Sequence, residues 1–128
     1  MMAAPFIIAV VDDDRRILES LGNLLESADY AVRLFSTATA LLDSGCLAEI
    51  DCLITDIGLS AMDGVELARL VQVARPQLPT ILITGQFDTL HRLSAVDLGR
   101  YRLFKKPFDG QDVLTAISDV LGGARLGR

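Results

Sequence analysis

Five short apolar runs alternate along the chain with longer amphipathic segments. The runs lie at 6–11, 31–35, 52–55, 80–84 and 101–104, and most are rich in Ile, Val and Leu. Apolar runs of this length, bounded by polar and turn-forming residues, are typical of β-strands. The first, third and fourth are almost continuously apolar, which predicts strands buried on both faces.

Helical periodicity fills the segments between these runs. After the first run, apolar residues recur at i, i+1, i+4, i+7 and i+8, which places them on one helix face. This helix is predicted over 15–27, with Asp14 as its N-cap. Similar patterns predict helices at 37–46, 65–71, 90–98 and 113–121, the last closed by Gly122 and Gly123. Strands alternating with helices predict an α/β fold, a doubly wound parallel sheet of five strands with five helices.

Length and composition indicate a single globular domain. The chain has 128 residues, 51% of them hydrophobic, which suits one core. We expect the domain to span 5–122, with 123–128 as a flexible tail or a truncated linker. No apolar run approaches the ~20 residues needed to cross a bilayer, and the N-terminus does not resemble a secretory signal. A cytoplasmic protein with no membrane partner is therefore expected.

Charge and cysteine content exclude further classes of function. The net charge of -5 disfavours binding of nucleic acid by this chain alone, because phosphates require a basic surface. Cys46 and Cys52 lack the neighbouring Cys or His residues of a zinc site and do not form a disulfide scaffold. We expect both to be plain buried thiols.

Chemically reactive side chains gather where the predicted strands end. Asp12 and Asp13 follow the first strand, Asp56 the third, Thr84 ends the fourth, and Lys106 follows the fifth. Sites in such sheets form beyond the carboxyl ends of the strands. Clustered carboxylates repel one another and need a proton or a cation, and oxygen ligands alone suit Mg²⁺.

These side chains together suit phosphoryl transfer to a carboxylate. Magnesium would neutralise charge on the transferring group, while Lys106 and Thr84 would bind its remaining oxygens. Taken singly, an Asp after a strand is often a helix cap, Thr84 could be an ordinary strand end, and Lys106 could be a solvated lysine. Their joint placement at the ends of four strands favours a site.

Four motifs in this sequence resemble the receiver domain of bacterial two-component response regulators over about residues 6–121. They are Ile-Ala-Val-Val-Asp-Asp-Asp at 8–14, Leu-Ile-Thr-Asp-Ile-Gly-Leu-Ser-Ala-Met-Asp-Gly at 53–64, Ile-Leu-Ile-Thr-Gly at 81–85 and Lys-Lys-Pro-Phe at 105–108. The resemblance implies a flavodoxin-like sheet with strand order 2-1-3-4-5. It also implies a phosphoprotein that signals by a change of conformation. Such a protein is not an enzyme, although it can remove its own phosphoryl group by hydrolysis.

The resemblance assigns a role to each site residue. It implies that Asp56 is the phosphoacceptor, that Asp13 and Asp56 bind Mg²⁺ directly, and that Asp12 acts through metal-bound water. It further implies that the backbone carbonyl of Gly58 is a metal ligand and that Thr84 and Lys106 contact the phosphoryl group. The Lys106–Pro107 peptide bond is expected to be cis.

The resemblance also implies the partners. A histidine kinase or a His-containing phosphotransfer domain would dock near the first helix, where Arg15, Arg16 and Leu18 are candidate contacts. An effector protein or a second copy of the chain would bind the face formed by helix four, strand five and helix five.

The sequence departs from the family pattern at several positions. Ser60 and Ala61 replace the usual Pro and Gly, which predicts a less rigid loop after Asp56. Gly58 places no side chain beside the acceptor, which eases the access of water, although Gln86 could shield or orient that water. Leu103 stands where the family carries an aromatic switch residue, and we therefore expect signalling to depend on Thr84 and a shift of helix four.

Two alternative functions remain open. The departures at Ser60 and Leu103 are compatible with a receiver-type module that binds partners without phosphorylation. A phosphatase of the haloacid dehalogenase type also uses an Asp nucleophile and Mg²⁺, but Arg16 occupies the position at which that family requires Thr or Val.

Overall fold

The computed structural model describes residues 5–58, 64–85 and 101–126. Strands and helices alternate from residue 7 to residue 84, as the hydrophobic pattern predicts, and residues 86–100 between the last two strands lie outside the described residues. The elements are β1 (Ile7–Val11), α1 (Arg15–Ser27), β2 (Ala31–Phe35), α2 (Ala38–Ser44), the 3₁₀ turn η1 (Cys46–Ala48), β3 (Cys52–Asp56), α3 (Gly64–Ala74), β4 (Thr80–Thr84), β5 (Arg102–Lys105) and α5 (Gly110–Leu126).

All five strands form one parallel sheet in the order β2-β1-β3-β4-β5. The predicted fold class and strand order are therefore confirmed. The register aligns Val11 with Thr55, Asp56 with Ile83, and Thr84 with Lys105. The last residues of neighbouring strands thus meet at one edge of the sheet.

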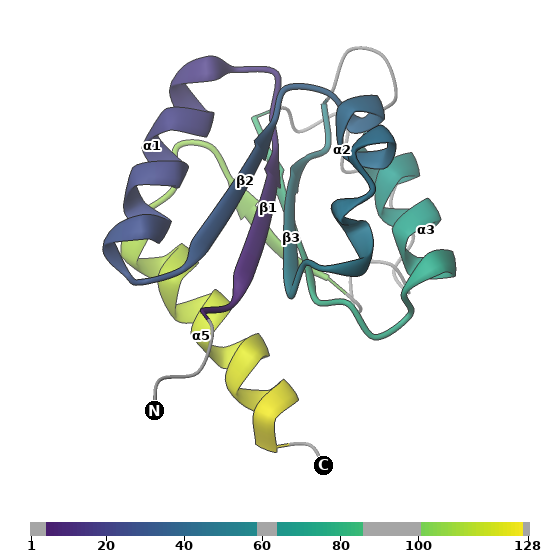
Figure 1. Ribbon diagram of the computed structural model, residues 1–128. Coiled ribbons are helices and arrows are strands. Elements are labelled where there is room, and N and C mark those ends of the chain that lie inside the picture. Colours follow the sequence, from purple (N-terminus) through teal and green to yellow (C-terminus); the bar gives the residue numbers. More distant parts are fainter. Residues whose placement is uncertain (1–4, 59–63, 86–100, 127–128) are drawn as a thin grey trace.

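Alternate strand residues face two separate cores. On one face Ile8, Val10 and Ile54 pack against α1 and α5. On the other face Ala9, Val11 and Leu53 pack against α2, η1 and α3. Figure 1 shows this layering, with α1 and α5 on one side of the sheet and α2 and α3 on the other. Burial on both faces confirms what the continuous apolar runs predict.

Helix α1 begins at the predicted residue. Asp14 is extended and its carboxylate accepts a hydrogen bond from the backbone N–H of Arg16, which makes it the N-cap. Leu18, Leu21 and Leu25 are buried against the sheet. The prediction that Leu18 contributes to a docking surface is therefore wrong, because its side chain fills the core on the inner face of the helix.

The C-terminal helix runs further than its sequence predicts. α5 continues through Gly122 and Gly123 to Leu126, so the predicted end at this glycine pair is wrong. Glycine lowers helix stability by only about 1 kcal/mol per residue, a preference that its context can override. The domain boundary at residue 122 stays a prediction, and the helix predicted at 90–98 lies outside the described residues.

Both cysteines are free and buried, as predicted. Burial raises the pKa of the Cys52 thiol to about 12, so it stays protonated at neutral pH. Within the part of the chain that the structure describes, no helix is both long and apolar enough to span a membrane.

Two glycines in open surroundings predict opposite effects of substitution by alanine. A Cβ at Gly122 or at Gly45 would meet nothing within 4 Å, but Gly45 has a φ of +75° at the end of α2. We expect Gly122→Ala to raise the free energy of unfolding by about 0.5–1 kcal/mol, and Gly45→Ala to lower it by about 1 kcal/mol through backbone strain. Urea unfolding followed by circular dichroism measures both, and shifts in the same direction would contradict this account.

Candidate functional site

A pocket of about 330 Å³ opens at the carboxyl edge of the sheet. It lies beyond the ends of β3 and β4 and beside the loops that follow β1 and β5. Its lining residues are Asp13, Asp14, Asp56, Gly58, Thr84, Gly85 and Lys106. Parallel strands bring these positions together because their carboxyl ends share one edge.

Asp56 occupies the last position of β3, the central strand of the sheet, and is 6% exposed. Its Oδ1 accepts a hydrogen bond from the backbone N–H of Gly58 at 3.0 Å. The next residue, Ile57, continues the ladder through its N–H to the carbonyl of Ile83 at 2.8 Å. The Gly58 amide therefore orients the Asp56 carboxylate, and the ladder bond of Ile57 fixes the backbone from which it projects.

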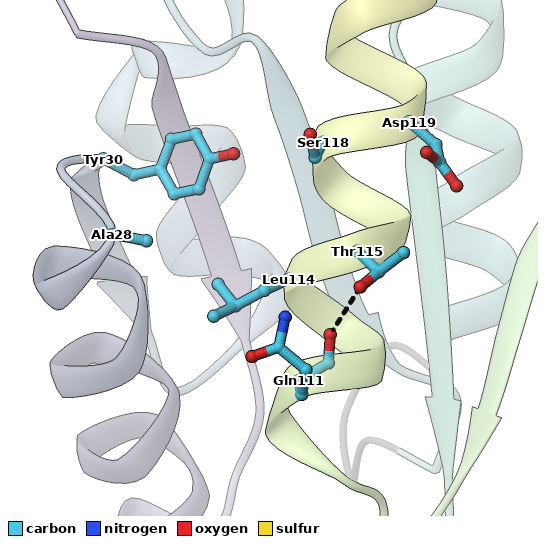
Figure 2. Close-up of a pocket in the computed structure, with 7 residues that line it drawn as sticks. All are labelled: Ala28, Tyr30, Gln111, Leu114, Thr115, Ser118 and Asp119. Atoms are coloured by element: carbon cyan, nitrogen blue, oxygen red, sulfur yellow. Dashed lines mark hydrogen bonds between the residues drawn. The ribbon is translucent and has the colours of Figure 1, made fainter.

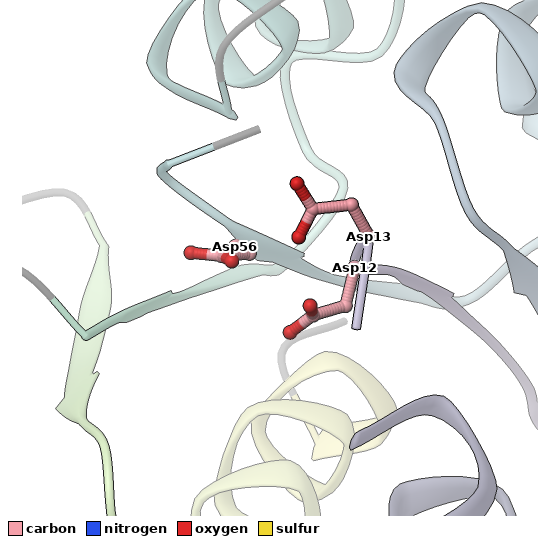
Figure 3. A group of neighbouring side chains, drawn as sticks. All are labelled: Asp12, Asp13 and Asp56. Atoms are coloured by element: carbon pink, nitrogen blue, oxygen red, sulfur yellow. The ribbon is translucent and has the colours of Figure 1, made fainter. Parts of the chain in front are cut away.

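Asp12 and Asp13 follow β1 and lie next to Asp56. Asp12 is 1% exposed, whereas Asp13 is exposed to solvent. One carboxylate oxygen from each of the three residues lies within 4.8 Å of the other two. Figure 3 shows that the three side chains project to the same side of the strand ends.

Lys106 supplies positive charge to this cluster. Its Nζ lies 3.0 Å from Asp12 Oδ2 and 3.2 Å from Asp56 Oδ2. Its backbone N–H donates to the carbonyl of Thr84 at 2.7 Å, which ties the lysine to the end of β4. The Lys106–Pro107 bond is cis, as predicted.

Burial and charge act in opposite directions on these groups. Desolvation raises the pKa of Asp12, assisted by the Asp56 charge and opposed by the hydrogen bond from the Asp14 amide and by the nearby Lys106 ammonium. Desolvation also acts to lower the pKa of Lys106, but Asp12 and Asp56 outweigh it and the pKa of this lysine is raised. The lysine therefore stays charged and only partly offsets the carboxylates.

The donor set fits a hard divalent cation. Asp12 Oδ2 is buried and accepts no hydrogen bond from the described residues, although the Lys106 ammonium lies 3.0 Å away. A buried charged oxygen without a directed donor is costly unless a cation compensates it. Three carboxylates with an exposed member suit Mg²⁺, which prefers oxygen ligands and retains several waters.

The structure brings together the side chains that the sequence selects for the site. Asp12, Asp13 and Asp56 form the carboxylate cluster, and Thr84 and Lys106 border it. A side chain at Gly58 would lie beside the acceptor, since its Cβ would be 3.8 Å from Asp56 Oδ1. The positions of Ser60 and Ala61 lie outside the described residues.

Sequence reasoning missed two residues of the pocket. Asp14 is predicted only as a helix cap, and Gly85 is not predicted at all, yet both line the pocket. Gly85 follows Thr84 directly, and a Cβ there would be 3.5 Å from Lys106 Cδ. The sequence signal that could have identified them is their position, because Asp14 directly follows Asp13 and Gly85 directly follows Thr84.

Leu103, which replaces the aromatic switch residue, lies on β5 and is half-buried. It packs against a small cluster that contains Leu82 and Tyr101. Tyr101 is 9% exposed, so its ring belongs to the core on this side of the sheet.

A second pocket of about 330 Å³ lies between the end of α1 and α5 (Figure 2). It is lined by Ala28, Tyr30, Gln111, Leu114, Thr115, Ser118 and Asp119. Asp119 is its single lining carboxylate and lies 3.8 Å from Arg102, while the Thr115 hydroxyl donates to the Gln111 carbonyl. This pocket lacks the carboxylate cluster. The pocket at the carboxyl edge of the sheet, called the acidic pocket below, is therefore the candidate for metal and phosphoryl chemistry.

Comparison with known proteins identifies relatives of this chain. A family model described as the response regulator receiver domain matches residues 8–118. The response regulator protein TmoT of Ectopseudomonas mendocina is 39% identical over 116 residues, 90% of this chain and 52% of its own length. The transcriptional regulatory protein FixJ of Azorhizobium caulinodans is 34% identical, over 90% of this chain and 54% of its own length.

A solved structure agrees in fold. The CheY-like response regulator receiver domain protein of Methanospirillum hungatei superposes with a TM-score of 0.84 and 26% identity, over 97% of this chain and 99% of its own. The chain spans about half the length of the two curated relatives.

Burial of the Asp12 carboxylate, together with repulsion from Asp56, predicts that Asp12→Asn stabilises the metal-free protein. Because the pKa of Asp12 is raised above 3.8, the folded protein holds this proton where the unfolded chain has lost it. The contribution of Asp12 to stability is therefore greatest at low pH and is lost as pH rises through the folded pKa. Asn mimics the neutral acid, so Asp12→Asn should have a higher free energy of unfolding than the wild type at pH values above the folded pKa of Asp12.

Urea unfolding in EDTA at a series of pH values measures this effect. Added Mg²⁺ should then stabilise the wild type more than Asp12→Asn, because only a ligand that binds the folded state raises its stability. A wild type that is more stable than Asp12→Asn at neutral pH without metal would contradict the account.

Proposed function

The chain belongs to the response regulator receiver domain family, and from this premise we propose that Asp56 is its phosphoacceptor. One observation carries the proposal. Asp56 is nearly buried at the end of the central strand, with one oxygen held by an amide and the other facing an ammonium, beside two further carboxylates. An attacking carboxylate needs this kind of fixed orientation and charge compensation.

The reaction is transfer of a phosphoryl group from a phosphohistidine. An Asp56 oxygen forms a bond to phosphorus, the phosphorus–nitrogen bond of the donor breaks, and its electron pair returns to the imidazole ring. The product is an acyl phosphate on Asp56, which water later hydrolyses to restore the carboxylate. Gly58 leaves the acceptor open to that water, so we expect the chain to lose its phosphoryl group without another enzyme.

Each neighbouring residue has a separate task. Lys106, whose ammonium contacts both Asp12 and Asp56, would pair with a phosphoryl oxygen. Thr84 offers a hydroxyl at the end of β4, opposite Lys105, the residue that precedes Lys106. Asp12, Asp13, Asp56 and the Gly58 carbonyl would hold Mg²⁺, which supplies neutralisation of charge on the transferring group.

The partners follow from the family. Receiver domains interact with histidine kinases and with effector domains. We propose that this chain is cytoplasmic and that a histidine kinase or His-containing phosphotransfer domain donates to it near α1. The exposed Arg15 and Arg16 remain candidates for that contact. Because the curated relatives are about twice as long, we propose that the output is an effector protein, an adjoining domain or a second copy.

A phosphorylation-independent interaction module is the second candidate. It rests on Leu103, whose half-buried aliphatic side chain cannot donate the hydrogen bond of a tyrosine. The intact carboxylate and lysine cluster favours the phosphoacceptor instead, since a module without this chemistry has no need of buried, mutually repelling charges.

Incubation with a small-molecule phosphodonor and Mg²⁺ should add one phosphoryl group to the wild type and none to Asp56→Asn. Intact-protein mass spectrometry measures the adduct, which should be stable in acid and labile in alkali. Asp43→Asn, an exposed carboxylate on α2, is the matched control and should be labelled like the wild type.

Other outcomes separate the alternatives. Absence of any adduct on the wild type would leave the interaction module. Rapid multiple turnover on phosphate esters would instead favour a phosphatase. Labelling of Asp56→Asn at the wild-type level would refute the assignment of the acceptor.

Phosphorylation should also change the chain around β4 and β5 despite Leu103. We expect amide NMR signals over residues 85–110 to shift in the phosphorylated wild type, because Thr84 and Lys106 rearrange around the new charge. Asp56→Asn with the same phosphodonor should give no shift. Identical spectra for both forms of the wild type would show that the signal does not reach this region.

A further inference from the structure

Asp14 contacts both the acidic pocket and helix α1. Its backbone N–H donates to Asp12 Oδ1 at 2.9 Å. Its own carboxylate accepts the backbone N–H of Arg16 at 2.9 Å as the N-cap of α1. Its carbonyl accepts the N–H groups of Ile17 and Leu18, each at 3.1 Å. One residue therefore links the orientation of Asp12 to the first turn of the helix.

The helix that Asp14 caps is itself fixed to the core. Leu18, Leu21 and Leu25 are buried between α1 and the sheet. A cap bonded to a fixed helix holds the turn between β1 and α1 in one conformation. Without the side-chain acceptor, the Arg16 N–H loses its partner and the turn is free to relax.

Asp12 depends on that turn for its orientation. One of its oxygens is held by the Asp14 N–H, and the other faces Lys106 and accepts no hydrogen bond from the described residues. The Asp14 N–H is thus the directed contact that fixes the plane of the Asp12 carboxylate. Rotation of this plane would move the oxygen that faces the other two carboxylates.

We propose that Asp14 is a positioning residue that sets the Mg²⁺ affinity of the acidic pocket by capping α1 and thereby holding Asp12. The inference rests on the proposed Mg²⁺ site. It assigns no contact between Asp14 and the metal, since the Asp14 carboxylate is engaged by Arg16. Partners of metal ligands commonly change metal affinity by about 10–100-fold.

The test is a titration with MgCl₂ alone, followed by amide NMR shifts. Asp14→Ala removes the cap, whereas Asp14→Asn keeps a cap of equal quality and removes only the charge. Thr37→Ala removes the N-cap of α2, whose hydroxyl accepts the Ala40 N–H at 3.0 Å. It is the matched control for a general loss of stability. Titrations in about 1 M KCl screen the long-range charge of Asp14, because the Debye length falls to about 3 Å.

We expect Asp14→Ala to weaken Mg²⁺ binding about tenfold, the lower end of the range for such partners. Asp14→Asn in high salt and Thr37→Ala should bind like the wild type. In the metal-free protein, hydrogen exchange at the backbone amides of positions 14 and 16 should accelerate in Asp14→Ala and in neither of the other two variants. If Asp14→Ala does not fold, Asp14→Gly removes the same acceptor at a smaller cost in helix stability.

Three results would overturn the proposal: wild-type affinity in Asp14→Ala, equal weakening in Asp14→Asn at high salt, or equal weakening in Thr37→Ala. A wild type that binds Mg²⁺ and accepts a phosphoryl group, combined with any of these results, refutes the role of Asp14 and leaves the proposed function intact. A wild type that binds no Mg²⁺ refutes the metal site and this inference together.

Discussion

Repulsion among three carboxylates at one edge of the sheet is the constraint on which the rest of the structure depends. Oxygens of Asp12, Asp13 and Asp56 lie within 4.8 Å of one another, and Lys106 contacts two of these side chains. Two like charges 4 Å apart repel by about 4 kcal/mol where the effective dielectric constant is about 20. The cluster persists because the backbone fixes it, and it is therefore poised to accept a cation.

The sheet supplies that fixed backbone. β1 and β3 are neighbours at its centre, and both are buried on their two faces by separate cores. Local amides then orient the side chains, with Gly58 bonded to Asp56 and Asp14 bonded to Asp12. The unfavourable charges thus project from strand ends that are anchored between two cores and bonded to local amides, which preorganises them for chemistry.

Sequence pattern predicts the elements well and their surroundings less well. The strands and α1 follow from apolar runs and helical spacing, and the site from side chains at strand ends. The continuation of α5 past Gly122 and the burial of Leu18 depend on tertiary packing, which the helix propensity of single residues does not predict. Likewise, adjacent carboxylates look equivalent in sequence, but Asp12 is buried and Asp13 is exposed.

The most direct test of the account is to locate the phosphoryl group chemically. Borohydride reduces an acyl phosphate on aspartate to homoserine, and peptide mass spectrometry then identifies the modified position. After treatment with a phosphodonor and Mg²⁺, homoserine should appear at position 56 and at no other aspartate. Homoserine at position 12 or 13, or an adduct that borohydride does not reduce, would contradict the assignment of Asp56 as the phosphoacceptor.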